Sequence, residues 1–290
     1  MDELLLSPDK AWKLNLVLQR LYLMGAPKVL MACIILLTAN SKLDTFTESI
    51  EFIEVFSGDG WVSKCMKANG IATVSFDIRL GDPLPGKQDA MDLLSDAGLV
   101  LVSILNAKFD SFMALFGLVC SSYVTISKGS HYRCPSSPLG LESMDFVKHG
   151  NEFTAKTTLL ILAVVAMGGS WMLEQPRSSL LTWHPRIRLL WRLLPKVYQA
   201  KWWAGMYGAP TWKRHIGWSS SPTIQCLDLG RLCKKYKDTI AKYGVKSTKQ
   251  YKSKTGVKRF AGSKALKSTG SLGYSVIATN LFSLSVMFAP

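Results

Sequence analysis

A short glycine turn stands between two segments whose residue types favour a strand and a helix. Residues 51–56 read EFIEVF, a β-branched and aromatic run typical of a strand, and residues 56–60 read FSGDG. Helical residues follow, and Asp77 ends the next strand-like run, IATVSFD. A turn that leaves a strand and opens a helix presents free backbone N–H groups, and its glycines let a ligand approach the backbone closely. A carboxylate at Asp77 can accept hydrogen bonds from the two hydroxyls of a ribose.

The spacing of this turn decides which ligand it suits. It does not match GxGxxG, the fingerprint of a dinucleotide site that binds a pyrophosphate. A ligand with a ribose and no pyrophosphate fits better, and S-adenosylmethionine is such a ligand. The alternative is an ordinary tight turn in which Asp59 caps the following helix.

The order of the surrounding elements predicts the fold class. Strand-like and helical runs alternate, which indicates an α/β protein with a doubly wound, mostly parallel, Rossmann-like sheet covered on both faces. The clearest helical runs are residues 1–48, broken at Gly25-Ala26-Pro27, and residues 142–168. In such sheets ligands bind beyond the carboxyl ends of the strands, which is where the glycine turn is expected to lie.

The stretch IEVFSGDGWVSKCMKANGIATVSFDI resembles the first motif of the C5-cytosine DNA methyltransferases, which has a strand, Phe-Ser-Gly-x-Gly, a helix and a second strand with an acidic tip. Later motifs of that family have counterparts here in the same order. They are Asp92 in DAMDLLSD, Cys120 in GLVCSSY, Glu174 in WMLEQP, and the run MYGAPTWKRH at residues 206–215. The resemblance covers about residues 50–218, and FSGDG and YGAP are its most specific parts.

The resemblance implies a reaction and a set of site residues. In that family a cysteine thiolate adds to C6 of a flipped-out cytosine, an acid near N3 stabilises the adduct, and C5 then takes the methyl group. Transferred to this chain, Cys120 is the nucleophile, Glu174 is the group at N3 and Asp92 binds the adenine amine. The nucleophile needs a low thiol pKa, which a helix N-terminus or Arg133 would supply. The expected cofactor residues are Phe56, Ser57, Gly58, Gly60, Asp77 and Asp92.

Three departures from the family pattern fall beside these residues. The Pro before the cysteine is Val119 here, the Asn after the glutamate is Gln175, and the Gln after YGxP is Thr211. They favour an alternative in which the fold binds nucleic acid without turnover, with Cys120 a small buried apolar residue. A methyltransferase with a protein or small-molecule substrate is a further alternative. The pattern CSSY…PLG…EQP…SSL…HP…YGA is also similar to that of uncharacterised methyltransferase-like proteins, a likeness that implies no particular activity.

Positive charge is concentrated toward the carboxyl-terminal end. The formal net charge is +15, and residues 231–267 hold thirteen Lys and Arg against one acid, Asp238. Tyrosines and Phe260 interleave with these lysines, which suits backbone contact and base stacking with nucleic acid, whereas the alternative is a solvated tail. Because few of the cations are arginine, we expect weak sequence preference and a steep salt dependence. The residues expected to contact nucleic acid are Arg133, Lys213, Arg214, Lys234, Lys235, Lys252, Lys254, Lys258 and Arg259.

Composition and the remaining segments limit the class of protein. The chain of 290 residues is 48% hydrophobic, which is enough for one large core or two smaller ones. Its six cysteines lack CxxC spacing and its four histidines form no ligand cluster, so we expect no metal site and reduced thiols in an intracellular, nuclear or cytoplasmic protein. The apolar runs at 29–39 and 158–173 are too short to span a bilayer and are expected to be buried. The expected divisions are a helical segment at 1–48, a methyltransferase-like domain at 49–218, a basic region at 219–270 and an apolar segment at 271–290.

Overall fold

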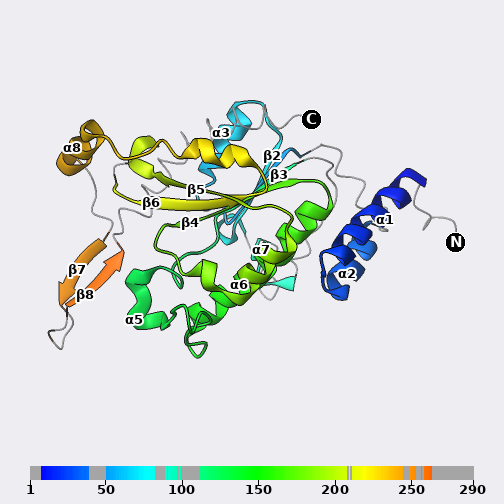
Figure 1. The fold of residues 1–290 in the computed structure, drawn as a ribbon, viewed down its shortest axis with the longest axis horizontal. Coiled ribbons are helices and arrows are strands. Elements are labelled where there is room, and N and C mark those ends of the chain that lie inside the picture. Colours follow the sequence, from blue (N-terminus) through cyan, green and yellow to red (C-terminus); the bar gives the residue numbers. More distant parts are fainter. Residues whose placement is uncertain are drawn as a thin grey trace.

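A computed structural model of the chain describes residues 8–38, 50–81, 89, 91–96, 98, 112–207, 209, 211–243, 248–252, 256 and 258–262. Its centre is a six-stranded sheet with the strand order β2-β1-β3-β4-β6-β5 (Figure 1). The strands are β1 (Phe52–Val55), β2 (Thr73–Phe76), β3 (Met113–Phe116), β4 (Ser170–Pro176), β5 (Tyr198–Trp203) and β6 (Arg214–Ser219), and β7 (Thr248–Lys252) and β8 (Lys258–Gly262) form a separate hairpin. The α-helices are α1 (Pro8–Leu23), α2 (Lys28–Thr38), α3 (Trp61–Ala68), α5 (Lys128–His131), α6 (Asp145–Ala166), α7 (Pro185–Leu193) and α8 (Lys234–Tyr243). Short 3₁₀ helices include η3 (Ile78–Leu80), η4 (Thr125–Ser127), η6 (Ala204–Tyr207) and η7 (Pro222–Leu227).

Four neighbouring strands of the sheet run parallel. β1 pairs with β2 on one side and with β3 on the other, and β3 pairs with β4. These pairings confirm the expected mixed α/β architecture with a mostly parallel, Rossmann-like sheet. β6 differs because it runs antiparallel to both β4 and β5. Only residues 204–213 connect β5 to β6, which is shorter than a crossover between parallel strands requires, so the chain turns back beside itself.

Helices cover both faces of this sheet. Successive residues of a strand point to opposite faces, and the central strands β1 and β3 are buried at every position and apolar at all but Glu54, as strands covered on both sides tend to be. On one face, Ile53, Ala114 and Phe116 share a core with residues of α1, α2, α6 and α7. On the other face, Phe52 and Met113 pack against α3 and η7. Figure 1 shows α6 and α7 on one side of the sheet and α3 on the other.

Most helix boundaries follow the local signals in the sequence. The predicted break at Gly25-Ala26-Pro27 separates α1 from α2, and Gly25 there has a left-handed φ of 68°. α6 lies within the predicted helix at 142–168 and its apolar end leads into β4. The run at 29–39 was expected to be a buried helix; it is helical, but its burial is only partial, because Ile34 is buried whereas Val29 is 74% exposed.

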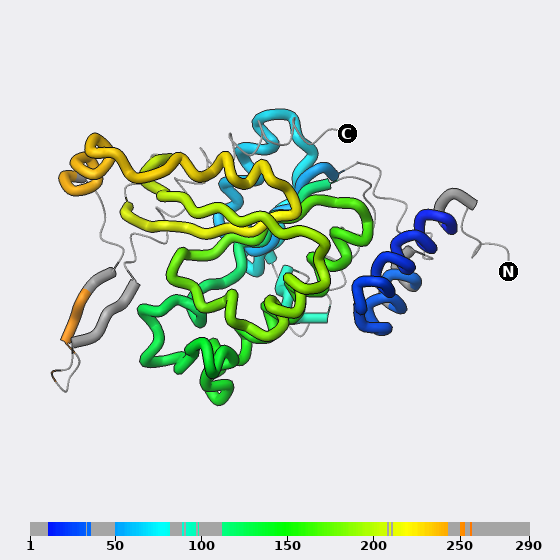
Figure 2. The backbone as a smooth tube through the Cα atoms, in the orientation of Figure 1, coloured from blue at the N-terminus to red at the C-terminus, as the bar shows by residue number. Residues whose placement is uncertain are grey.

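The helices α1 and α2 lie at one end of the long axis of the molecule and α8 lies at the other (Figure 2). None of the helices in the part of the chain that the structure describes is long and apolar enough to cross a membrane.

Candidate functional site

The segments with candidate chemistry leave from one edge of the sheet. β1, β2 and β3 end level with one another, because Val55 pairs with both Phe76 and Phe116. The segments that follow these strands hold the glycine turn, Asp77 and Cys120, so the three lie at the same edge. β2 lies on one side of β1 and β3 on the other, which makes the β1–β3 boundary the point where strand order reverses. In open α/β sheets ligands bind at such a point.

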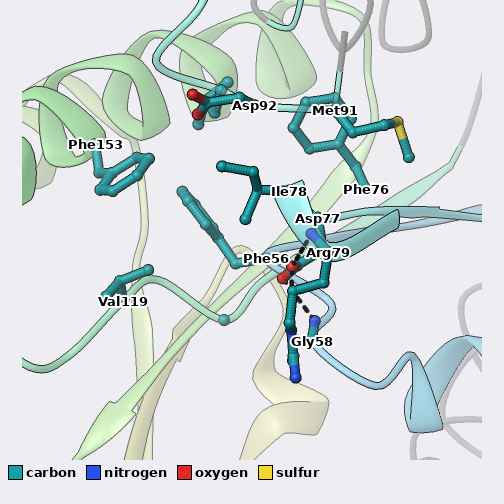
Figure 3. Close-up of a pocket in the computed structure, with 12 residues that line it drawn as sticks. Phe56, Gly58, Phe76, Asp77, Ile78, Arg79, Met91, Asp92, Val119 and Phe153 are labelled. Atoms are coloured by element: carbon teal, nitrogen blue, oxygen red, sulfur yellow. Dashed lines mark hydrogen bonds and ion pairs between the residues drawn. The ribbon is translucent and has the colours of Figure 1, made fainter. Parts of the chain in front are cut away.

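A pocket of about 330 Å³ opens at this point. That volume lies at the lower end of the range for small-molecule sites. Four of the six expected cofactor residues line the pocket, namely Phe56, Gly58, Asp77 and Asp92 (Figure 3). The other two, Ser57 and Gly60, belong to the same turn and are not in the lining.

The walls of the pocket are mainly apolar and aromatic. Phe56 meets Phe153 of α6 edge to face, with 5.3 Å between the ring centroids. Met91 and the carboxylate-bearing Asp92 lie across the pocket from Gly58 in Figure 3. A wall of this kind suits a flat and partly apolar ring whose orientation is fixed by a few polar groups.

The backbone of the glycine turn has an unusual conformation. Phe56, Gly58 and Gly60 have φ values of 61°, 60° and 64°. Glycine adopts such angles freely, whereas for phenylalanine they cost about 1–3 kcal/mol, and strain of this kind is concentrated at ligand sites. The Gly58 N–H donates to the Asp77 carboxylate over 2.7 Å, which ties the turn to the end of β2. The alternative in which Asp59 caps the next helix is wrong, because Gly60 occupies the cap position of α3 and no side chain caps it.

Arg79 lies across the mouth of this turn. Its guanidinium contacts Asp77 at 3.4 Å and Asp59 at 3.0 Å, and a Cβ on Gly58 would come within 2.2 Å of its Nη2. Its backbone N–H also donates to Asp77 over 3.0 Å. A carboxylate has about four lone-pair positions, and N–H groups of Gly58 and Arg79 occupy three on Asp77. Asp77 therefore has room for one ribose hydroxyl, rather than two, while Arg79 stays in place.

A buried glutamate beneath the turn was missed by the sequence analysis. Glu54 of β1 accepts the Ser63 N–H at 2.8 Å and the Ser63 hydroxyl at 2.5 Å, so it fixes the first turn of α3. Burial raises the pKa of Glu54 to about 7, with Ser63 opposing the shift and Asp77 adding to it. The signal in the sequence is an acid in the middle of FIEVF, because a charged residue in a strand buried on both faces needs a specific partner.

Cys120 has an environment that differs from the expected one. It is half-buried beyond the end of β3, and its carbonyl accepts the N–H groups of Tyr123 and Val124 in a tight turn. Burial raises the pKa of the Cys120 thiol, Lys213 opposes this, and Glu174 adds to it. The expectation of a low thiol pKa is therefore wrong.

The expectations for Arg133 are also wrong. Its side chain is fully buried, so it is not available to nucleic acid, and it does not contribute to the pKa of Cys120. The guanidinium lies 4.1 Å from the centre of the Tyr123 ring. It donates over 2.7–3.1 Å to the carbonyl oxygens of Ser122, Pro138 and Val147 and to the side chain of Asn151. Arg133 is thus the centre of a scaffold that holds the loop after Cys120 against α6.

Glu174 of β4 is paired with a histidine that the sequence analysis did not single out. Nδ1 of His215 on β6 is hydrogen-bonded to Oε1 of Glu174, and both side chains are buried. Burial lowers the pKa of His215, and Lys213 lowers it further, while Glu174 raises it. The sequence gives no local signal for this pair, because the partner of His215 lies 41 residues away.

Gln175 of β4 connects its strand to the loop that carries Cys120. Its Nε2 donates to the Leu118 carbonyl over 2.6 Å, and its Oε1 accepts the Ser179 hydroxyl. The loop that carries Cys120 is therefore bonded to the strand that carries Glu174. Val119 lines the pocket, whereas Cys120 and Glu174 do not, so the pocket and the Cys120 cluster are neighbouring sites at one edge.

The expected nucleic-acid residues fall into three groups. Lys213 is partly buried near Cys120, and the Arg214 guanidinium lies 5.0 Å from the centre of the Trp203 ring. Lys234 and Lys235 of α8 and Lys252 of β7 are exposed. Lys258 and Arg259 lie in β8, where only the backbone is described, and Lys254 lies outside the described residues.

Among the residues that the structure describes, no three His, Cys, Asp or Glu side chains are grouped so that they could hold a metal ion. No protein-family model matches the chain, and a search of curated proteins finds no match to it.

Proposed function

We propose that this protein is an S-adenosylmethionine-dependent methyltransferase-like protein that acts on nucleic acid. The observation that carries the proposal is the pocket at the β1–β3 boundary. The sequence predicts cofactor contacts at the glycine turn, Asp77 and Asp92, and Phe56 and Gly58 of the turn line one cavity with both acids at the edge where α/β sheets bind ligands. Because Asp92 is separated from the turn by more than thirty residues, their meeting in one cavity supports a common ligand.

The residues present fit the chemical groups of that ligand. The apolar walls, with Phe56 and Phe153, suit an adenine ring, and the carboxylate of Asp92 in the lining suits its amine as an acceptor. Asp77 accepts a ribose hydroxyl, and the space over the Gly58 backbone, which the Arg79 guanidinium fills, suits the methionine part once Arg79 moves aside. The ligand supplies an activated methyl group when it is bound.

The position of the basic hairpin supports a nucleic-acid substrate. β8 lies against η4, the short helix that follows the Cys120 loop. Ile240 of α8 is buried against Gly205 of η6, the short helix that follows β5. This contact anchors the basic helix α8 to the end of the sheet. Cations on α8 and the hairpin therefore flank the edge that carries the proposed site, as expected for a surface that follows a phosphate backbone.

A second candidate is nucleic-acid binding without methyl transfer. The raised pKa of the Cys120 thiol favours it, because a nucleophile of this class reacts as the thiolate. If Cys120 is active, its chemistry is the C5-cytosine type, with Glu174 at N3 of the base.

Calorimetric titration with S-adenosylmethionine tests the proposal. We expect micromolar binding to the unmodified protein and at least a tenfold loss in Asp77→Asn, which keeps the size of the side chain and removes its charge. The matched control is Asp59→Asn, an acid of the same turn that contacts Arg79 and does not line the pocket. Absence of binding at millimolar ligand, or equal losses in the two variants, would refute the cofactor site.

A further inference from the structure

Positive charge is also concentrated in residues 170–220. They hold eight Lys and Arg against one acid, Glu174, which is buried. Five of these eight cations are arginines, compared with two of the thirteen in residues 231–267. Four of the arginines are exposed, and none of the four forms an ion pair with a carboxylate in the part of the chain that the structure describes. We call these four the α7 arginine surface: Arg177, Arg186, Arg188 and Arg192.

The helix α7 presents three of these arginines on a fixed support. On its inner side, the ring of Trp191 lies between the buried rings of Trp171 and Trp218, with 5.8 Å between centroids in each pair. Arg188 and Arg192 are exposed and stand four residues apart, so they lie on one side of the helix about 6 Å apart along its axis. The packing of the tryptophans therefore fixes where the two guanidinium groups leave the protein.

The first turn of α7 does not follow the usual charge preference of helices. The N-terminal end of a helix carries a partial positive charge, so acids stabilise it and cations there are unfavourable. The first turn of α7 has no acid and includes Arg186. His184 caps the helix through Nδ1, which accepts the Arg186 N–H over 3.3 Å, and Pro185 follows. Local helix stability does not account for an arginine at this position, which favours a role in binding an anion.

The surface continues to the carboxyl edge of the sheet. Arg177 follows the last residue of β4, and its N–H donates to the Arg214 carbonyl over 2.8 Å. The Arg214 guanidinium lies 5.0 Å from the centre of the Trp203 ring, and Trp212, two residues earlier, is 45% exposed. Residues 177–184 lead from this edge to α7. Cations next to an exposed aromatic ring are the combination with which proteins hold a phosphate backbone and stack its bases.

We propose that the α7 arginine surface is a second nucleic-acid surface, which binds the phosphate backbone beside the carboxyl edge. A guanidinium group binds a phosphate through two parallel N–H donors and stays charged at every physiological pH. A partner protein of mixed charge would find no exposed acid in residues 170–220 to pair with its own cations, whereas a uniformly negative backbone needs none. The inference rests on the proposed function in that nucleic acid is the substrate, but the binding of phosphate does not depend on S-adenosylmethionine.

The affinity of the full-length protein for a fluorescent single-stranded oligonucleotide, measured by anisotropy over a range of salt concentrations, tests this surface. Arg188→Gln combined with Arg192→Gln removes two exposed cations from α7, so the slope of log affinity against log salt should fall by about one to two. The matched control is Lys64→Gln combined with Lys67→Gln on α3, which lies on the opposite face of the sheet (Figure 1). The control should keep the slope of the unmodified protein. An unchanged slope in the arginine variant, or equal falls in both variants, would overturn the inference.

Two further measurements identify the source of the phosphate and separate this inference from the proposed function. Arg188→Lys combined with Arg192→Lys keeps both charges and removes the paired donors, so the slope should stay unchanged while the affinity at fixed salt falls about threefold. Binding to vesicles that contain an anionic phospholipid, lost in the Gln variant while oligonucleotide binding is kept, would show a lipid surface and would overturn the assignment to nucleic acid. Failure of S-adenosylmethionine to bind would refute the cofactor site and leave these slopes unaffected.

Discussion

The edge of the sheet at the carboxyl ends of its parallel strands has two halves, and they are built differently. The β2–β1–β3 half carries an open pocket, a strained glycine turn and the partly exposed ion pairs of Arg79. The Cys120 and Glu174 half is closed and is held by buried polar contacts around Arg133, Gln175 and His215. The open half keeps the glycine turn and the acid of the family pattern that it resembles, whereas two of the three departures, Gln175 and Thr211, are buried outside the pocket and the third, Val119, lines it. The two halves therefore depend on separate sets of contacts, which variants can disturb independently.

Of the variants considered, loss of Arg133 is expected to lower the stability of the protein most. Arg133→Met removes the donor to the Ser122 and Pro138 carbonyl oxygens and to the Asn151 side chain, and each buried acceptor left without its donor costs about 1–3 kcal/mol. Urea denaturation measures this as a lower free energy of unfolding.

Arg79→Met is the matched control in the open half. The Arg79 ion pairs are largely solvent-exposed, so the expected loss is below about 1 kcal/mol. Similar losses in the two variants would contradict the contrast between an open and a closed half.

Titration of Glu54 is expected to have the next largest effect. Its pKa is about 7 in the folded protein and 4.5 in the unfolded chain. The folded state therefore binds the proton more tightly, so this contribution to stability is complete below pH 4.5 and is lost as the pH rises through 7. The loss amounts to at most about 3 kcal/mol. Glu54→Gln should remove this part of the pH dependence, measured as the free energy of unfolding between pH 4.5 and 8.

Glu51→Gln, just before the same strand, is the control for Glu54. Glu51 is exposed and accepts only the Ala72 N–H among the contacts described. Its replacement should therefore leave the dependence of the free energy of unfolding on pH unchanged. If the curves of Glu54→Gln and the unmodified protein stay parallel, Glu54 does not titrate in this range.

The open half could be predicted from the sequence because its contacts are local. Gly58 and Asp77 belong to one strand–helix–strand unit of fewer than thirty residues, and the glycine turn, the acid and the strand order all follow from that unit. The alternation of strands and helices also predicted the mostly parallel sheet. What the local pattern did not reveal was Arg79, because the direction of a long exposed side chain is not determined by the pattern of neighbouring residue types.

The closed half could not be predicted because its contacts join distant segments. His215 and Glu174 are brought together by the antiparallel placement of β6, which depends on the short connection from β5 and not on any motif. Arg133 stands in a run rich in Gly, Pro and Ser, which is typical of an exposed loop. The fold instead buries it against α6, and its charge alone could not distinguish the two outcomes.

The smallest expected effect concerns the basic surface. In Lys234→Ala combined with Lys235→Ala, two exposed cations of α8 are lost, and the slope of log affinity for nucleic acid against log salt should fall by about two. Fluorescence anisotropy with a single-stranded oligonucleotide over a range of salt concentrations measures the slope.

The control for this prediction removes the same charge from another helix. Lys64 and Lys67 are exposed on α3, which lies on the face of the sheet opposite α6 and α7. Their double replacement by Ala should leave the salt slope nearly unchanged if nucleic acid follows the α8 and hairpin side. An equal fall in both double variants would mean that binding depends on the net charge of +15 rather than on a defined surface. In that case the basic segment would not direct a substrate to the Cys120 edge, and the closed half would have to be explained without a nucleic-acid ligand.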